Sequence, residues 1–193
     1  SWSEVTNIPY SVRDLTGFGI QTAAVSAGGY SGTAVISTTA NYDGTNWTNS
    51  GSMATARSAL AGSGTQTAGL VAGGQAPSNT DATEEYDGSS WTTGGTLSSV
   101  RSQAKGAGIQ TSSLIFGGVT PTSPTNSALT ELYDGTSWTG QANLATARRA
   151  IQPAGTATAA LAAGGNPGTT TVAITEEFTG GTEVVTASTL TTS

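Results

Sequence analysis

The chain has neither cysteine nor histidine among its 193 residues, and only 9% of its residues are charged. Without cysteine it can form no disulfide, no thiolate nucleophile and no cysteine-ligated zinc or iron–sulfur site. Without histidine it can form neither a Ser-His-Asp triad nor a histidine-ligated metal site. Apolar runs of transmembrane length are missing too, so we expect no membrane-spanning helix. These absences exclude whole classes of catalysis and metal binding.

Basic residues are also scarce. The chain has 6 lysines and arginines against 12 aspartates and glutamates, and its formal net charge is −6. Nucleic-acid binding needs a basic patch that contacts phosphates, so we expect no nucleic-acid partner. Residues 1–4 lack the basic and apolar regions of a secretory signal, so we expect no signal peptide. Nothing in the composition indicates a cofactor.

Glycine is what the chain has in excess, with 27 residues, and serine and threonine are abundant beside it. Modest hydrophobicity, here 35%, is typical of disorder only when it comes with high net charge. Low charge with many glycines and threonines is instead typical of β-structure with tight turns. We therefore predict one soluble all-β domain over residues 1–193.

An internal repeat organises the chain. Gly-Gly pairs recur at intervals of 45, 44 and 47 residues, beginning at Gly28, Gly73, Gly117 and Gly164. Tyr-Asp-Gly triplets, each followed by a tryptophan, give the pairs Tyr42 and Trp47, Tyr86 and Trp91, and Tyr133 and Trp138. An arginine recurs at intervals of 44, 44 and 47 residues, at Arg13, Arg57, Arg101 and Arg148. The fourth unit is degenerate, because Phe178 replaces the tyrosine and no tryptophan follows. Such a period indicates stacked structural units.

Each unit reads as four short strands. The first begins near the arginine, the second is apolar and stops at Gly-Gly, the third ends at the tyrosine, and the fourth carries the tryptophan. The Asp-Gly pair before the fourth strand predicts a two-residue hairpin turn. Four strands in a unit that cannot bury its face alone predict the blade of a β-propeller. We place the blades at residues 11–53, 54–97, 98–144 and 145–190.

These landmarks resemble the kelch repeat, and the resemblance covers nearly the whole chain. It rests on Gly-Gly after the second strand, Tyr-Asp, the tryptophan, and the arginine that opens each unit. The short strands of small residues and the lack of histidine depart from the usual kelch pattern. They are more similar to the Gly/Thr-rich kelch-type arrays of predicted structural proteins of marine phages and some bacteria. The resemblance implies a kelch-like propeller in a virion or another extracellular assembly.

Two segments compete for the fourth strand of the last blade. Residues 1–10 carry Trp2, which lies 45 residues before Trp47, and they can close the ring as an extra strand. Residues 183–187 also read as a strand. We expect a closed four-bladed propeller. The alternative is a partial propeller completed by another chain or by a longer array.

The recurring charges are predicted to form a structural network. Glutamates recur at one position of the repeat, at Glu84, Glu131 and Glu176, where the first unit has Ala40. Arginine binds carboxylates through parallel hydrogen bonds, and a pair between adjacent strands or blades would neutralise a buried charge. We therefore assign the four repeated arginines and three glutamates to the scaffold. A ligand-binding ring of arginines is the alternative.

The loops after the Gly-Gly pairs differ most between units, and variable loops on a rigid scaffold commonly bind partners. Candidate binding residues on these loops are Tyr30, Asn79, Pro121, Asn126 and Asn166. The longest loop, residues 119–126, contains two prolines, which reduce the entropy lost when the loop is ordered. We expect a protein or a glycan to bind here.

The predicted function is therefore a non-enzymatic structural or binding module, with no catalytic and no metal site. A carbohydrate-active enzyme or lectin that uses the propeller face is one alternative, and a kelch-type protein–protein adaptor is another. A glycosidase would need paired carboxylates, for which Glu131 and Glu176 of neighbouring blades are the candidates. Asp43, Asp87 and Asp134 stand one to a loop, which suits turns better than calcium.

Overall fold

The computed structural model describes residues 1–121 and 125–180. The described residues form strands, turns and loops and no helix, which confirms the predicted all-β class. They build three antiparallel sheets of four strands, one of three strands and two small hairpins. We call the four larger sheets sheets 1 to 4 in chain order.

The strands of each sheet run outward from the innermost strand in the order given. Sheet 1 consists of β1 (Thr16–Ile20), β2 (Ala23–Ala27), β3 (Thr39–Tyr42) and β4 (Trp47–Ser50). Sheet 2 consists of β5 (Ala61–Thr65), β6 (Ala68–Ala72), β9 (Thr83–Tyr86) and β10 (Trp91–Thr93). Sheet 3 consists of β11 (Lys105–Ile109), β12 (Ser112–Phe116), β15 (Thr130–Tyr133) and β16 (Trp138–Gly140). Sheet 4 consists of β17 (Gln152–Gly155), β18 (Ala159–Ala163) and β19 (Thr175–Thr179).

The two small hairpins lie in the loops after Gly-Gly. They are β7 (Gln75–Ala76) with β8 (Ser78–Asn79), and β13 (Val119–Thr120) with β14 (Thr125–Asn126). Each continues the chain directly beyond the second strand of its sheet.

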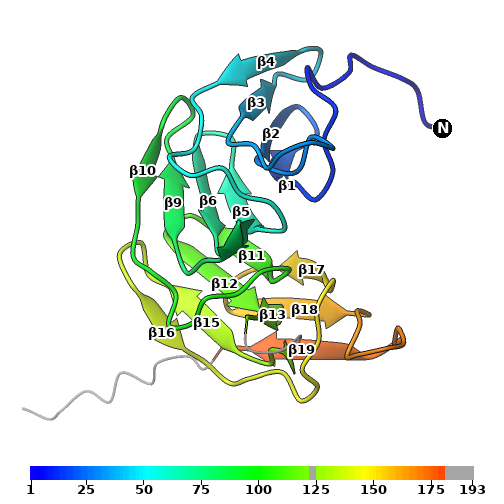
Figure 1. Ribbon diagram of the computed structural model, residues 1–193, viewed down its shortest axis with the longest axis vertical. Helices are drawn as coiled ribbons and strands as arrows, with labels where there is room; N and C mark the ends of the chain where they lie inside the picture. Colours follow the sequence, from blue (N-terminus) through cyan, green and yellow to red (C-terminus); the bar gives the residue numbers. More distant parts are fainter. Residues whose placement is uncertain (122–124, 181–193) are drawn as a thin grey trace, which may run out of the picture.

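The four sheets stand side by side along an open arc (Figure 1). Their innermost strands β1, β5, β11 and β17 are neighbours in that order, and the later strands of each sheet point outward. Within the described residues no hydrogen bond joins sheet 4 to sheet 1. The structure thus shows the row of four sheets but not the closed ring that we predicted.

The first segment proposed to close the ring does not act as a closing strand. Residues 1–10 form no strand and lie beside sheet 1, where the Thr6 hydroxyl donates a hydrogen bond to the Thr45 carbonyl. The Trp2 side chain is fully exposed. The second candidate, residues 183–187, lies outside the described residues.

The hydrophobic core is divided between the junctions of adjacent sheets. We call these the first, second and third junctions, from sheets 1 and 2 to sheets 3 and 4. At the second junction, Leu70 of sheet 2 packs with Ile115 and Tyr133 of sheet 3, and all three are buried. A similar cluster forms around Leu60 and Val71 at the first junction, and another lies at the third junction. Each sheet therefore depends on its neighbours for burial of its faces.

The Tyr-Asp-Gly segments form four-residue loops, and not the two-residue turns that the Asp-Gly pair predicted. In sheet 3, Tyr133 pairs with Trp138 across the hairpin. The Asp134 carboxylate accepts the Thr136 and Ser137 N–H groups at 2.8 and 2.7 Å. These bonds lower the pKa of Asp134, and Asp43 and Asp87 are held in the same way. The aspartates therefore cap loops, because a side-chain acceptor outweighed the intrinsic turn preference.

Candidate functional site

Arg57 joins two sheets through different parts of the same residue. Its carbonyl accepts a hydrogen bond of 2.8 Å from the Gly29 N–H of sheet 1. Its guanidinium donates to the carbonyls of Gly73 and Ala82 in sheet 2, at 2.9 and 2.8 Å. The same group forms an ion pair of 2.7 Å with Glu84 on β9. The backbone of Arg57 thus holds one sheet while its side chain holds the next.

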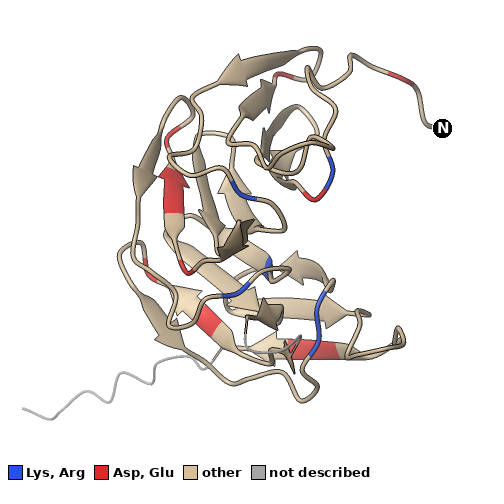
Figure 2. Ribbon diagram, viewed as in Figure 1, with Lys and Arg blue, Asp and Glu red and all other residues tan. Residues whose placement is uncertain are grey.

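The same combination of a backbone hydrogen bond and an ion pair repeats at the next two junctions. The Arg101 carbonyl accepts the Gly74 N–H at 2.9 Å, and its guanidinium binds Glu131 at 2.5 Å. The Arg148 carbonyl accepts a hydrogen bond of 3.0 Å from the second glycine of the third pair, and its guanidinium binds Glu176. Figure 2 shows the acidic positions on the third strand of sheets 2, 3 and 4. The Gly-Gly pairs therefore serve the junctions as well as the turns.

Because these ion pairs are buried, each charge depends on its partner. The side chains of all three arginines are 0% exposed, whereas the side chains of their glutamates are 4%, 2% and 20% exposed in chain order. Desolvation lowers the pKa of Arg57 and of Arg101, although the facing glutamates oppose this shift. For Glu176 burial acts to raise the pKa, but hydrogen bonds from Arg148 and the Ala145 N–H lower it overall. Removing one partner of such a pair would leave a buried charge without compensation.

Arg13 does not belong to this set, which corrects the sequence prediction. The backbone of Arg13 pairs with Tyr30, in the loop after the first Gly-Gly pair. In the other units the residue that pairs with this loop is Ser58, Ser102 or Arg149, each of which directly follows the junction arginine. Arg13 therefore stands one position after the junction arginines in the repeat. Its side chain is 70% exposed and binds Asp14 at 2.7 Å. Val12 occupies the arginine position, and Ala40 the glutamate position. Sheet 1 therefore lacks both partners of the pair together, so no single buried charge remains there.

Tyr30 is the candidate binding residue with the most distinctive surroundings. Its ring is half-buried, and the guanidinium carbon of Arg13 lies 4.7 Å from the ring centroid. An arginine over an aromatic face is held by cation–π attraction while its N–H groups stay available. Tyr30 and Arg13 thus form one amphipathic patch at the loop that follows the first Gly-Gly pair.

Asn79 and Asn126 have a structural role that the sequence prediction missed. The Asn79 amide donates a hydrogen bond of 2.9 Å to the Val119 carbonyl, across the second junction. The Asn126 amide donates one of 3.0 Å to the Asn166 carbonyl, across the third junction. The signal was available, because asparagine stands at the equivalent, strand-paired position of both small hairpins.

The two other candidates differ in how far their side chains are engaged. Pro121 is exposed at the end of β13, and residues 122–124 of its loop lie outside the described residues. The Asn166 side chain accepts the Gly168 N–H at 2.7 Å, which shapes its own loop. The loop face therefore presents Tyr30, Arg13 and Pro121, while the asparagines stabilise the scaffold.

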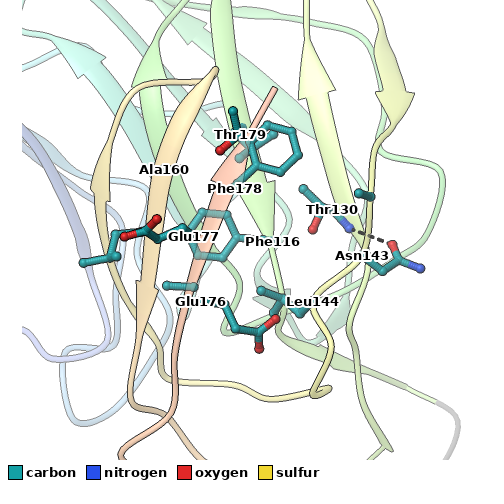
Figure 3. A pocket seen from close by; sticks show the side chains of 13 residues that line it. Phe116, Thr130, Asn143, Leu144, Ala160, Glu176, Glu177, Phe178 and Thr179 are labelled. Atoms are coloured by element: carbon teal, nitrogen blue, oxygen red, sulfur yellow. Dashed lines mark hydrogen bonds between the residues drawn. The ribbon is translucent and has the colours of Figure 1, made fainter. Parts of the chain in front are cut away.

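A cavity of about 270 Å³ lies at the third junction (Figure 3). Its walls are mostly apolar and include Leu144 and Phe178, with Thr130 and Ala142 at one side. The equivalent space at the second junction holds the Trp138 indole. Its N–H donates to the Thr83 hydroxyl and the Gly95 carbonyl at 3.0 and 2.9 Å.

The cavity therefore has the form of an indole socket. Thr130 and Ala142 stand at the repeat positions of Thr83 and Gly95, the two acceptors used at the second junction. At the first junction Trp91 likewise donates to Thr39, at 2.9 Å. The fourth unit has no tryptophan at this position of the repeat.

The carboxylates considered for catalysis are engaged in the scaffold. One oxygen of Glu131 binds Arg101 and the other accepts the Ser98 N–H at 2.8 Å. Glu176 is bound in the same way by Arg148 and Ala145. Within residues 1–121 and 125–180, no group of three acidic side chains is placed to hold a metal ion. The same residues contain no helix that could cross a membrane.

The site thus consists of a loop face on a scaffold whose buried charges join sheet to sheet. No protein-family model matches the chain, and comparison with curated proteins finds no match.

Proposed function

We propose that the chain is a non-enzymatic structural and binding module, a kelch-like β-propeller array that presents the loops after its Gly-Gly pairs to a protein or glycan partner. On the sequence resemblance, we place it in a phage virion or another extracellular assembly. Its four sheets are the blades of the array, of which the structure shows an open row.

One observation carries the scaffold part of this proposal. Three buried arginines each bond one sheet through the backbone and the next through an ion pair with glutamate. Most recurring ionisable groups are therefore used to align sheets. A scaffold of this kind keeps its loops in fixed positions, which lowers the entropy lost on binding.

The patch of Tyr30 and Arg13 supports the binding part. A half-buried aromatic ring offers a rigid surface for a sugar ring or an apolar side chain. The adjoining guanidinium adds donors suited to carboxylates or hydroxyls. Asn79 and Asn126 are excluded from this role, because their amides bond neighbouring sheets.

A glycan array probed with the wild-type chain and with Tyr30→Ala tests the proposal. We expect glycan binding that Tyr30→Ala abolishes while the midpoint of thermal unfolding stays unchanged. Ile109→Thr is the matched control, because Ile109 is 54% exposed and Thr65 occupies its repeat position in sheet 2. Binding that survives Tyr30→Ala would contradict the loop-face site. Turnover of a bound glycan would contradict the non-enzymatic assignment.

A further inference from the structure

Each junction has two chemically different halves, and among the described residues one such half is left without a partner at each end of the arc. At the first junction, the Gln66 amide of sheet 2 donates to the Ala24 and Tyr42 carbonyls of sheet 1, at 3.1 and 2.7 Å. Gln110 repeats this at the second junction with the carbonyls of Gly69 and Tyr86. A later sheet thus supplies glutamine and tryptophan donors, and an earlier sheet supplies acceptors.

Sheet 1 presents an unused later-sheet half. Gln21 stands at the position of Gln66 and is exposed, and Trp47 stands at the position of Trp91 and is half-buried as Trp91 is. Among the described residues, neither side chain has a hydrogen-bond partner. Val12 still offers the backbone carbonyl that the junction arginines offer elsewhere. The set of groups that would dock onto a preceding sheet is therefore nearly complete.

Sheet 4 presents an unused earlier-sheet half. The Gly165 N–H stands where those of Gly29, Gly74 and Gly118 bond the next sheet, and in the described residues it has no partner. A Cβ at Gly117 would lie 2.6 Å from the Arg148 carbonyl oxygen. At Gly164 the nearest atom would be 3.6 Å away. The outer edge of β19 is also unpaired in the described part of sheet 4.

Residues 2–5 match the outer-strand position of sheet 4, which no described residue occupies. They lie 45 residues before β4, and Trp2 holds the position of Trp47. The Thr6 hydroxyl contacts the Thr45 carbonyl, as the Gly51 N–H contacts the Ser89 carbonyl where the chain crosses from sheet 1 to sheet 2. This segment therefore enters sheet 1 as the outer strand of any sheet enters the next. Its indole suits the socket beside Thr130 (Figure 3).

We infer that the arc docks head to tail with a second copy of this chain. Sheet 1 of one copy packs on sheet 4 of the next, residues 2–5 pair with the edge of β19, and Trp2 fills the indole socket. One docking would give partners to Gln21, to the Gly165 N–H and to the edge of β19 together. The second copy is favoured over the chain's own N-terminus, because residues 1–10 lie beside sheet 1 and the arc is open (Figure 1). Residues 183–187, the other candidate for the edge of β19, lie outside the described residues, and association that Trp2→Ala leaves unchanged would favour them. The inference rests on the blade array of the proposed function and not on loop-face binding.

Such a contact joins two different surfaces, so it builds a ring if the rotation closes and a filament if it does not. Sedimentation equilibrium from low micromolar to several hundred micromolar chain measures it. We expect reversible association that Trp2→Ala and Gly164→Ala each weaken by about tenfold or more. In the single chain Trp2 is fully exposed, and a Cβ at Gly164 would come no nearer than 3.6 Å to another residue. Gly32→Ala is the control, because Gly32 also has positive φ and open space, and we expect no change.

The strand register expected in the docked state predicts one variant that strengthens association. β15 pairs Tyr133 with Trp138 and Glu131 with Gly140, so docking would place Trp2 opposite Phe178 and Glu4 opposite Glu176. Like charges directly opposite each other are unfavourable. Glu4→Gln should therefore tighten association.

Two results would overturn the inference. The first is a chain that stays monomeric over the whole range. If its Trp2 fluorescence also shows a shielded indole, the chain closes on itself. The second is association that neither Trp2→Ala nor Gly164→Ala weakens. Tyr30→Ala should leave association unchanged, so the loop-face proposal and this inference fail in separate measurements.

Discussion

The second and third junctions share one set of contacts and differ in another. Both have a buried arginine bound to glutamate, and both have a glycine N–H bonded to that arginine's carbonyl. The second junction adds the Trp138 and Gln110 bonds. The third has no described counterpart of either, and Ala157 stands at the glutamine position.

The third strands of sheets 3 and 4 also differ in burial. In β15, Thr130, Glu131 and Tyr133 are buried, whereas no residue of β19 is. The Glu131 side chain is buried from solvent, whereas the Glu176 side chain stays partly exposed. β3 of sheet 1 has the same burial pattern as β15, although the Trp47 and Gln21 side chains have no hydrogen-bond partner among the described residues. The burial of a third strand therefore follows from the sheet that comes after it, and no described sheet follows sheet 4. The arginine contacts are enough to place a sheet in the row.

The largest effect is expected from the arginines. Arg101→Met would leave Glu131 buried without its partner, which costs about 3–5 kcal/mol of the free energy of unfolding. Arg148→Met should lower it less, because Glu176 can be hydrated. Arg13→Ala, outside the network, should change it by no more than about 0.5 kcal/mol. Urea titration measures all three, and a smaller loss for Arg101→Met than for Arg148→Met would contradict the comparison.

A pair of glycine variants isolates the close approach between sheets. Gly117 and Gly164 have φ of 69° and 65°, so alanine is strained equally at both, by about 1–2 kcal/mol. Only at Gly117 would the new Cβ also meet a backbone carbonyl of the next sheet. Gly117→Ala should therefore be the more destabilising by about 1 kcal/mol or more in dilute protein. An equal fall in the midpoint of thermal unfolding for the two variants would mean that the third junction accommodates the added Cβ without cost.

A smaller loss is expected at the glutamine position. Gln110→Ala removes two hydrogen bonds across the second junction, worth about 0.5–1.5 kcal/mol each. The variant should loosen the second junction, with faster amide exchange in β9, whose Tyr86 carbonyl loses its donor, and little change in β3. A uniform loss of protection over all sheets would show that the chain unfolds as one unit and that the junctions are not separable.

The smallest effect concerns acid. The pKa of Glu176 is lowered in the folded chain, so its contribution to stability is present above its ordinary pKa and is lost as pH falls through the lowered value. Glu176→Gln should flatten this part of the curve of unfolding midpoint against pH. An unchanged slope between about pH 5 and pH 3 would contradict the assigned shift.

Much of the scaffold could be predicted from the sequence, because the repeat fixes which residues are equivalent. The Gly-Gly pairs, the tryptophans and the pairing of Arg57, Arg101 and Arg148 with glutamates follow from spacing alone. The prediction that Arg13 belongs to the network was wrong because it followed residue identity and not spacing. The first Gly-Gly interval is 45 residues, but the first arginine interval is 44. The spacing alone points to Val12.

Other features depend on geometry that the sequence leaves open. Whether Asn79 faces a ligand or the next sheet depends on how closely two hairpins approach. Whether four units close a ring depends on the rotation at each junction, which small differences in packing set. The four-residue loops depend on the aspartate side chains outweighing a backbone turn preference.

Amide hydrogen exchange at the second glycine of each pair tests whether successive sheets are held by the same backbone and arginine contacts. In dilute chain, we predict slow exchange at Gly29, Gly74 and Gly118, whose N–H groups bond the next sheet, and fast exchange at Gly165. Equal exchange at all four positions in the dilute chain would contradict the account.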